Sequence, residues 1–266
     1  MEKLTIRLFI IVATFFGTWW CLRQVDWMTL FHVEDISQST EEKLGELYWD
    51  IYQNIEHETE DQKVIVPIDS LLTRICSRND IDREKLKLHI ITKNDINAFA
   101  LPDDHLVLFT GLIEDCENEA ELCGIIAHEI AHMENGHIMK KLIKEVGLAM
   151  LISMTTGKGN PEIVQKAIRV LSSSAYDRNL ESDADIKGAD YLINADIDPE
   201  AFAEFLFRMS SREKDYPKQI FWISTHPGSE ERTKAIISYI SGKEYEKKMI
   251  LDSAQWSQLK ISVKEN

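Results

Sequence analysis

Two histidines and a glutamate lie within five residues of one another, in an arrangement that could bind a metal ion and use it. The segment reads His128-Glu129-Ile130-Ala131-His132, an H-E-x-x-H sequence. In an α-helix, residues four apart lie on one face, one turn from each other, so both imidazoles can reach a single ion. Zinc suits two histidines, one carboxylate and an open position for water. Glu129 projects beside them and could accept a proton from a zinc-bound water, which indicates hydrolysis by general-base catalysis.

The surroundings of this motif distinguish a buried metal site from a solvated helix. A pattern of five residues is only moderately specific, because a chain of this length contains it by chance about 1% of the time. The alternative to a metal site is a surface helix with two hydrated histidines. Apolar side chains close to the motif favour a buried helix instead, namely Leu122, Ile125, Ile126 and Ile130.

A third ligand is available from an acidic segment that runs from Arg178 to Asp185. Its Glu181 and Asp185 are four residues apart, so they share one face of a helix. Glu181 could complete the zinc site. Asp185 could accept a hydrogen bond from the outer N–H of a ligand histidine, which would fix its tautomer. Alone, such a segment is more often a solvated acidic face, but downstream of H-E-x-x-H the ligand interpretation is favoured. The predicted ligands are therefore His128, His132 and Glu181.

Helices must hold these side chains, and the spacing of apolar residues predicts them. The motif lies in a predicted helix over residues 118–135, with Gly136 suited to its C-terminal cap. The acidic segment lies in a predicted helix over residues 175–194. Residues 212–225 have no regular pattern. Further helices are expected over residues 39–55, 67–77, 138–155, 161–171, 199–211 and 229–241.

A small antiparallel sheet is expected before the motif helix. Apolar and polar residues alternate over residues 85–92, which predicts a strand, and residues 97–101 and 105–110 predict a hairpin. The predicted fold class is therefore α+β and mainly helical, with a zincin-like catalytic domain. Its active-site helix would lie beside the sheet.

The expected domain organisation has four parts, since neither an internal repeat nor a long linker interrupts the chain. Residues 1–23 are a signal anchor, and residues 24–80 are a helical part that packs on the catalytic domain. Residues 81–245 form the catalytic core and residues 246–266 a C-terminal tail.

The N-terminal segment has the properties of a membrane anchor. Fifteen residues without a charge, Leu8 to Leu22, follow Lys3 and Arg7. Basic residues before the apolar run favour a cytoplasmic N-terminus, so the rest of the chain would lie outside the cytoplasm. We expect residues 4–22 to enter the membrane, with the catalytic domain on the periplasmic side if the source is Gram-negative. The alternative is a cleaved signal peptide and a secreted protein.

The charge of the chain restricts its partners. The chain has 266 residues, of which 30 are Lys or Arg and 45 are Asp or Glu, for a net charge of −15. This acidity argues against nucleic acid and against anionic membranes as general partners. Cys76, Cys116 and Cys123 would allow one disulfide in an oxidising compartment, and the sequence leaves the pairing open.

Several further segments occur in a characteristic order around the motif. They are Asn97–Pro102, Thr110–Leu112, Asn118–Leu122, Arg178–Asp185 with Gly188, and Thr225-His226-Pro227 with Arg232. Together, over about residues 84–240, they resemble the gluzincin zinc metallopeptidases of metallopeptidase family 48. That family includes HtpX, LoiP, BepA and the related Ste-type prenyl-protein (CAAX) endopeptidases. Two positions depart from the family pattern: Asp103-Asp104 replaces a common Gly-Gly turn, and Asp177 stands where Ser is frequent.

The resemblance implies roles for residues outside the motif. His226 would donate a hydrogen bond to the developing oxyanion, or would act as a reversible fourth ligand. Arg232 would anchor the His226 loop through a carboxylate, and Arg178 would belong to the same supporting group. Asn97, Ala98 and Phe99 would hold an extended peptide substrate by pairing it to the sheet edge.

The resulting functional prediction is a zinc-dependent metalloendopeptidase with one Zn²⁺ per subunit. Its substrates would be proteins, either misfolded or resident in the cell envelope. The alternative is a zinc-stabilised envelope chaperone or assembly-binding module with little proteolysis. Glu129 favours the peptidase, because a binding module has no need of a catalytic base. His137 is expected to end a helix and to be a poor ligand, since five helical residues turn it about 140° away from His132.

Overall fold

The computed structural model describes residues 7, 12–20, 38–156, 161–173, 175–213 and 221–265. The chain divides into two compact units, residues 1–41 and 42–266. In the first unit residues 12–20 are helical, and the other residues of the predicted anchor, apart from Arg7, lie outside the described part. Among the described residues, no helix combines the length and the apolar character needed to cross a bilayer.

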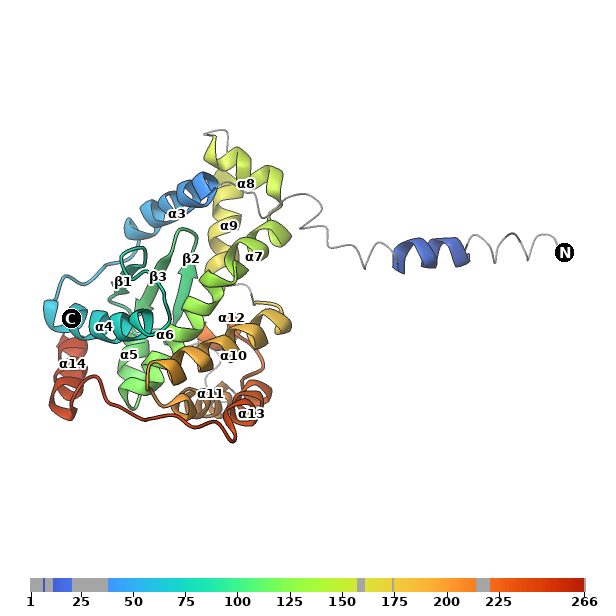
Figure 1. Ribbon diagram of the computed structural model, residues 1–266. Helices are drawn as coiled ribbons and strands as arrows, with labels where there is room; N and C mark the ends of the chain where they lie inside the picture. The colour runs from blue at the N-terminus through green and yellow to red at the C-terminus, as the bar shows by residue number, and fades with distance from the viewer. Residues whose placement is uncertain are drawn as a thin grey trace. The chain divides into compact units, whose positions relative to one another are not determined.

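A three-stranded sheet lies in the second unit (Figure 1). Its strands are β1 (Lys87–Ile91), β2 (Ala98–Leu101) and β3 (His105–Phe109), in the order β1-β3-β2. The predicted hairpin is present, because β2 pairs antiparallel with β3. The prediction of a wholly antiparallel sheet is wrong, because β1 pairs parallel with β3. Strand β3 is buried throughout and therefore takes the central place in the sheet. The alternation of apolar and polar residues in β1 does not indicate which strand β1 pairs with.

The turn between β2 and β3 explains the two aspartates that replace glycines. Asp103 and Asp104 have φ angles of 63° and 57°, in the left-handed region that glycine favours and aspartate tolerates better than most residues. The carboxylate of Asp103 also pairs with the ammonium group of Lys87. The hairpin therefore forms with Asp-Asp as it would with Gly-Gly.

The sheet has a different neighbour on each face. Leu106 and Leu108 of β3 join the main apolar core, which includes helices α4 (Gln62–Ser77) and α6 (Glu119–Glu134). His105, one residue out of step with them, points to the opposite face. Helix α3 (Gln38–Gln53) packs on that face, where its Trp49 contacts His105.

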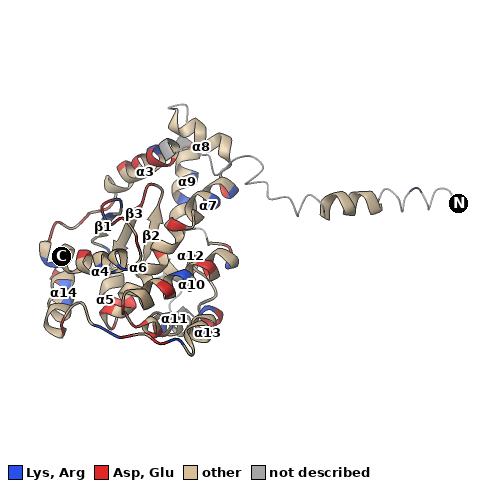
Figure 2. Cartoon of the chain, in the orientation of Figure 1, with Lys and Arg blue, Asp and Glu red and all other residues tan. Residues whose placement is uncertain are grey.

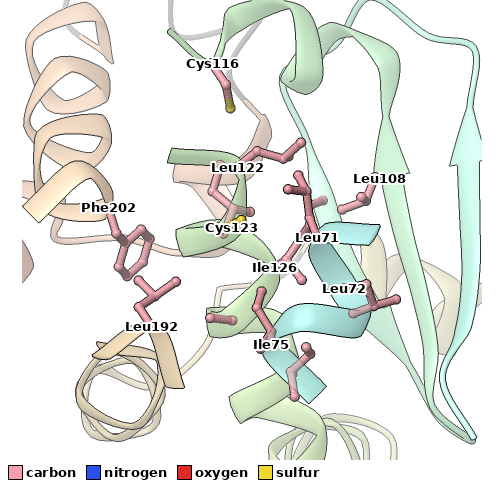
Figure 3. Packing of buried hydrophobic residues seen from close by; sticks show 14 of the residues in the cluster. Leu71, Leu72, Ile75, Leu108, Cys116, Leu122, Cys123, Ile126, Leu192 and Phe202 are labelled. Carbon is pink, nitrogen blue, oxygen red and sulfur yellow. The ribbon is translucent and has the colours of Figure 1, made fainter. Parts of the chain in front are cut away.

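The active-site helix is enclosed by the core (Figure 3). Leu71, Leu72 and Ile75 of α4 pack toward Leu122 and Ile126 of α6. Helices α10 (Arg178–Asn194) and α11 (Pro199–Glu213) also pack against α6. Burying several apolar side chains of this size stabilises the fold by about 1.5–3 kcal/mol each. Because α6 is buried on several sides, its polar side chains must find partners inside the protein.

The remaining helices are α5 (Thr110–Asp115), α7 (His137–Glu145), α8 (Leu148–Thr155), α9 (Pro161–Ser173), α12 (Phe221–Thr225), α13 (Ser229–Ile240) and α14 (Ser253–Glu265). The mainly helical α+β fold with a small sheet is thus confirmed. The single helix expected over residues 138–155 is two helices, because Gly147 lies between them with φ 96°.

The expected C-terminal tail contains α14, which packs on α4 and α5. Residues 42–80 belong to the same compact unit as the catalytic core. Cys76, Cys116 and Cys123 are buried free thiols, and burial raises the pKa of each. No disulfide therefore joins these three residues.

Candidate active site

Close packing of two helices brings the predicted ligands together. Helix α6 carries His128 and His132, and α10 carries Glu181. The helices cross at Gly188, where a Cβ atom would lie 3.2 Å from the backbone nitrogen of His128. That separation is tighter than ordinary contact, so glycine permits the approach that any larger residue would resist. Asn118 caps the start of α6 by accepting a hydrogen bond from the Glu121 N–H at 3.0 Å.

Four side chains converge on one point inside the protein. His128 Nε2 lies 3.0 Å from His132 Nε2 and 3.2 Å from His226 Nδ1. Glu181 Oε1 lies 3.0 Å from His226 Nδ1 and 3.4 Å from His132 Nε2. The four residues are buried, and each offers a ligand atom within 4.8 Å of the others. In the described part of the chain this is the one such group of histidine, cysteine, aspartate or glutamate.

The spacing of these atoms fits a tetrahedral ion. Ligand atoms about 2.0–2.1 Å from a tetrahedral zinc are about 3.3 Å from each other, close to the separations seen here. Without a cation, at least two of the three ring nitrogens must present the same kind of group, either both an N–H or both a lone pair. Burial, together with the neighbouring His128, lowers the pKa of His132 well below its usual value, so the ring is held neutral. A neutral imidazole is the form that binds zinc.

The outer nitrogens of both α6 histidines have partners that orient the rings. His128 Nδ1 lies 3.0 Å from Asp185 Oδ1, as the sequence predicts. His132 Nδ1 lies 3.1 Å from Nδ1 of His137. With Nδ1 engaged on the outside, each ring directs Nε2 toward the convergence point. Such outer partners fix the tautomer and ring orientation of metal ligands.

Arg232 joins Glu181 and Asp185 of α10 to the His226 loop. Its guanidinium donates to Asp185 through Nε and Nη2, both at 2.7 Å, and to the His226 carbonyl at 2.9 Å. Nη1 also lies 2.8 Å from Glu181 Oε2. Burial alone would raise the pKa of Glu181 and of Asp185, but Arg232 and the nearby histidines lower both. Both side chains are therefore held as carboxylates.

Glu129 is placed beside this cluster with one oxygen still available. Its Oε1 accepts a hydrogen bond from the indole N–H of Trp222 at 3.1 Å and lies 3.3 Å from His226 Nε2. Its Oε2 is buried, and no described residue donates a hydrogen bond to it. The indole of Trp222 also stacks on the His226 ring, with centroids 4.7 Å apart. Trp222 thus contacts both Glu129, the predicted base, and His226, and positions the two side chains together.

Tyr176 and Lys141 cover another side of the cluster. The Tyr176 ring packs against His132 with centroids 4.1 Å apart, and the Lys141 ammonium lies 3.9 Å from the centre of the Tyr176 ring. Lys141 is buried, which lowers its pKa to about 8. Its Nζ has no hydrogen-bond partner among the described residues. A cation–π contact with Tyr176 accounts for its position.

The other predicted site residues lie farther from the cluster. Asn97, Ala98 and Phe99 are buried at the start of β2, the edge strand on the side away from β1. Helix α9 packs against β2. Arg178 has a side chain 81% exposed and pairs with Glu231 at 3.5 Å, outside the group around Arg232. Arg178 is therefore not among the residues that orient the ligands.

Three residues of the site were not predicted from the sequence, and each lacked a local signal or had a misleading one. His137 follows Gly136, which has φ 63° and separates α6 from α7, so helical spacing counted from His132 does not apply to it. Trp222 lies in a segment without apolar periodicity. Tyr176 falls inside the helix predicted over residues 175–194, whereas α10 begins at Arg178, so helical spacing does not place its ring beside His132.

Comparisons with known proteins agree with this geometry. The family described as peptidase family M48 matches residues 66–240, well over half of the chain. The mitochondrial metalloendopeptidase OMA1 of Schizosaccharomyces pombe is 24% identical over 214 residues, which cover 77% of this chain and 63% of that protein.

Two other relatives match shorter stretches. The bovine mitochondrial metalloendopeptidase OMA1 is 30% identical over 161 residues, which cover 55% of this chain and 31% of that protein. The beta-barrel assembly-enhancing protease of Escherichia coli is 26% identical over 179 residues, which cover 62% of this chain and 36% of that protein. The chain thus spans less than two thirds of each of these relatives.

Proposed function

The chain belongs to peptidase family M48, and on that premise we propose that it is a zinc-dependent metalloendopeptidase acting on protein substrates. The observation that carries this proposal is the convergence of His128, His132 and Glu181 beside Glu129, whose Oε2 receives no hydrogen bond from the described residues. A ligand set of two histidines and one carboxylate is that of catalytic zinc sites, and an adjacent carboxylate supplies the base.

His128, His132 and Glu181 would hold the zinc ion. When bound, zinc acts as a Lewis acid that makes water acidic and polarises a carbonyl. Glu129 would take a proton from the attacking water with Oε2 while the Trp222 indole holds Oε1. The same carboxylate would then deliver the proton to the leaving amine. Positioned acid–base groups of this kind contribute about 10²–10⁴-fold to the rate.

His226 would occupy the fourth position of the cluster in this arrangement. Its Nδ1 faces the ligand atoms, whereas its Nε2 faces Glu129. A substrate carbonyl needs that fourth position, so His226 would have to withdraw and could then donate to the oxyanion. The carbonyl of His226 is held by Arg232, which ties any such movement to the α10 carboxylates.

A peptide substrate would bind as an extended strand along β2. The position of β2 at the sheet edge supports this, because an edge strand leaves backbone groups that another strand can pair with. Asn97 and Ala98 would supply these backbone groups, and Phe99 would line the same strand. Since α9 packs on β2, it would have to shift when a substrate pairs there.

Membrane attachment through residues 4–22, with the catalytic domain outside the cytoplasm, is also part of the proposal. The apolar run after Lys3 and Arg7 supports it. The name of the Escherichia coli relative connects that protein with the assembly of beta-barrels. By analogy, the substrates of this chain would be misfolded or envelope proteins.

Glu129→Gln tests the proposed chemistry. We expect the full chain to lose about 10³-fold in cleavage of a casein-like substrate, because the amide cannot take the proton. Zinc content should stay at the wild-type level, since Glu129 is not a ligand. Glu134→Gln, an exposed position at the end of the same helix, is the matched control and should cleave normally.

Two results would contradict the peptidase proposal. One is a Glu129→Gln variant that cleaves at the wild-type rate. The other is a zinc-loaded wild-type chain that binds unfolded proteins but never cleaves them, which would favour the chaperone interpretation.

A further inference from the structure

The charge of this chain is distributed unevenly, and one segment is basic. Residues 137–173, which form α7 to α9, contain six Lys or Arg residues and two Glu residues, for a net charge of +4. The rest of the chain contains 24 Lys or Arg residues and 43 Asp or Glu residues, for a net charge of −19. Electrostatic attraction to a negatively charged surface would therefore be concentrated at this segment.

The same segment carries an uncharged helix with exposed apolar side chains. From Val146 to Gly157, twelve consecutive residues have no charge. Helix α8 lies within this stretch, and Figure 2 shows it free of Lys, Arg, Asp and Glu. Leu151 and Met154 are buried and hold α8 on the protein, whereas Met150 is 47% exposed and Ile152 is 46% exposed. One face of α8 thus offers apolar surface to the outside.

Exposed lysines lie on α7 and α9, the two helices that pack against α8. Lys166 of α9 donates to the carbonyl of Glu145 at 2.6 Å, directly before α8, and Lys140 of α7 donates to the carbonyl of Asn135 at 3.1 Å. In the described part of the chain, neither ammonium group is paired with a carboxylate. Lys144 pairs with Asp177, but both side chains are more than half exposed, so water and salt screen the pair. The acidic residues of α7 and α9 are Glu145 and Glu162.

We propose that α8 rests on the surface of an anionic lipid bilayer. Met150 and Ile152 would enter the boundary between headgroups and acyl chains, and Lys140, Lys144 and Lys166 would lie among the headgroups. Exposed apolar side chains with basic residues nearby bind an anionic membrane surface through the apolar area that they bury and through electrostatic attraction. Helix α8 rises about 12 Å over its eight residues, which is too short to cross a core of about 30 Å. It therefore lies on the membrane.

The length of chain near the N-terminus makes a bilayer the best-fitting partner for this face. Fifteen residues, 23–37, separate the apolar run that ends at Leu22 from the start of α3. Fully extended, they reach about 50 Å, so an inserted run keeps the catalytic unit close to the bilayer. This argument rests on the proposed anchor, whereas the contact itself involves other residues and does not depend on peptidase activity.

Hydrogen–deuterium exchange of the full chain in lipid nanodiscs tests the proposal, because it reports on α8 while the anchor stays inserted. We compare discs of phosphatidylcholine, discs containing phosphatidylglycerol, and detergent micelles. Amides of residues 147–156 should exchange several-fold more slowly in the anionic discs than in the neutral discs or in detergent. Replacing Lys144 and Lys166 by Gln should weaken this protection, by about fivefold in affinity for each lysine near the surface.

Matched substitutions separate membrane contact from a change of folding. Met150→Asp with Ile152→Asp should abolish the protection in anionic discs. Ile237→Asp with Ile261→Asp, at exposed apolar positions of α13 and α14, should leave it unchanged. Equal exchange in all three environments would overturn the proposal. Protection in detergent that grows with protein concentration would also overturn it, since a second copy of the chain would then cover α8.

Discussion

Two groups of histidines occur in the described part of this protein, and their nitrogens are arranged in opposite ways. In the active site, ring nitrogens of His128, His132 and His226 point at one another across 3.0–3.2 Å. On the outer face of the sheet, His89 and His105 are joined end to end. His89 Nδ1 lies 2.9 Å from a Glu58 oxygen, and its Nε2 lies 2.9 Å from His105 Nδ1.

The group on the sheet satisfies its own hydrogen-bonding needs. The chain of contacts continues from His105 Nε2 to the Lys87 ammonium at 3.4 Å, so each ring nitrogen has a polar partner. Trp49 of α3 stacks on the His89 ring with centroids 3.4 Å apart. A linear series of donors and acceptors needs no ion, whereas a convergent group of acceptors does. The direction of the nitrogens, more than the number of histidines, distinguishes the metal site.

The largest expected effect is the loss of zinc affinity on Asp185→Asn, which changes the active-site group only. The substitution removes the negative charge that faces His128 Nδ1. The same carboxylate accepts hydrogen bonds from Nε and Nη2 of Arg232. Loss of such an outer partner costs about 10–100-fold in metal affinity. Asp190→Asn on the same helix is the control, because Asp190 accepts hydrogen bonds from Tyr239 and Lys243 away from the site. Competition with a zinc-binding dye measures both affinities, and equal values would show that Asp185 does not orient the ligand.

An effect of about 2 kcal/mol per histidine is expected when the sheet histidines are titrated. Burial lowers the pKa of His89 and of His105 to about 4, below the usual value of about 6.5 in an unfolded chain. Between these values the unfolded chain binds more protons, so acidification favours unfolding. By pH 5 each histidine should have cost about 2 kcal/mol of stability, which is regained above pH 6.5.

Thermal unfolding of the His89→Gln/His105→Gln variant checks this expectation. The variant should be less stable than the wild type at pH 7, but its midpoint should fall less between pH 7 and pH 5. Parallel pH dependence of the two proteins would show that these histidines are not held neutral by the fold.

A smaller effect, about tenfold in activity, is expected at His137. His132 Nδ1–H donates toward His137 Nδ1, and the side-chain oxygen of asparagine can accept in nearly the same place. His137→Ala should therefore lower both zinc affinity and activity, and His137→Asn should restore most of the loss. If alanine and asparagine were equivalent, His137 would act through packing alone.

The sequence predicted those parts of the site that depend on helical periodicity. His128, Glu129 and His132 lie on one helix, and Glu181 and Asp185 lie four apart on another, so local geometry fixes each pair. The features that it did not predict depend on the direction that the chain takes after a helix ends or on pairing over a distance. His137 faces His132 because Gly136, with φ 63°, ends one helix and begins the next. The parallel pairing of β1 with β3 is likewise set by burial in three dimensions, and the His89–His105 contact follows from it.

The comparison of the two histidine groups is tested most directly by counting zinc. The wild-type chain, His132→Ala and His89→Gln/His105→Gln are each dialysed against excess zinc and then against buffer, and metal per chain is measured by elemental analysis. Circular dichroism checks that each protein is folded. The account predicts one zinc per chain in the wild type and in the sheet variant, and almost none in His132→Ala. A His132→Ala chain that keeps its zinc, or a sheet variant that loses it, would contradict the assignment of the metal to the convergent group.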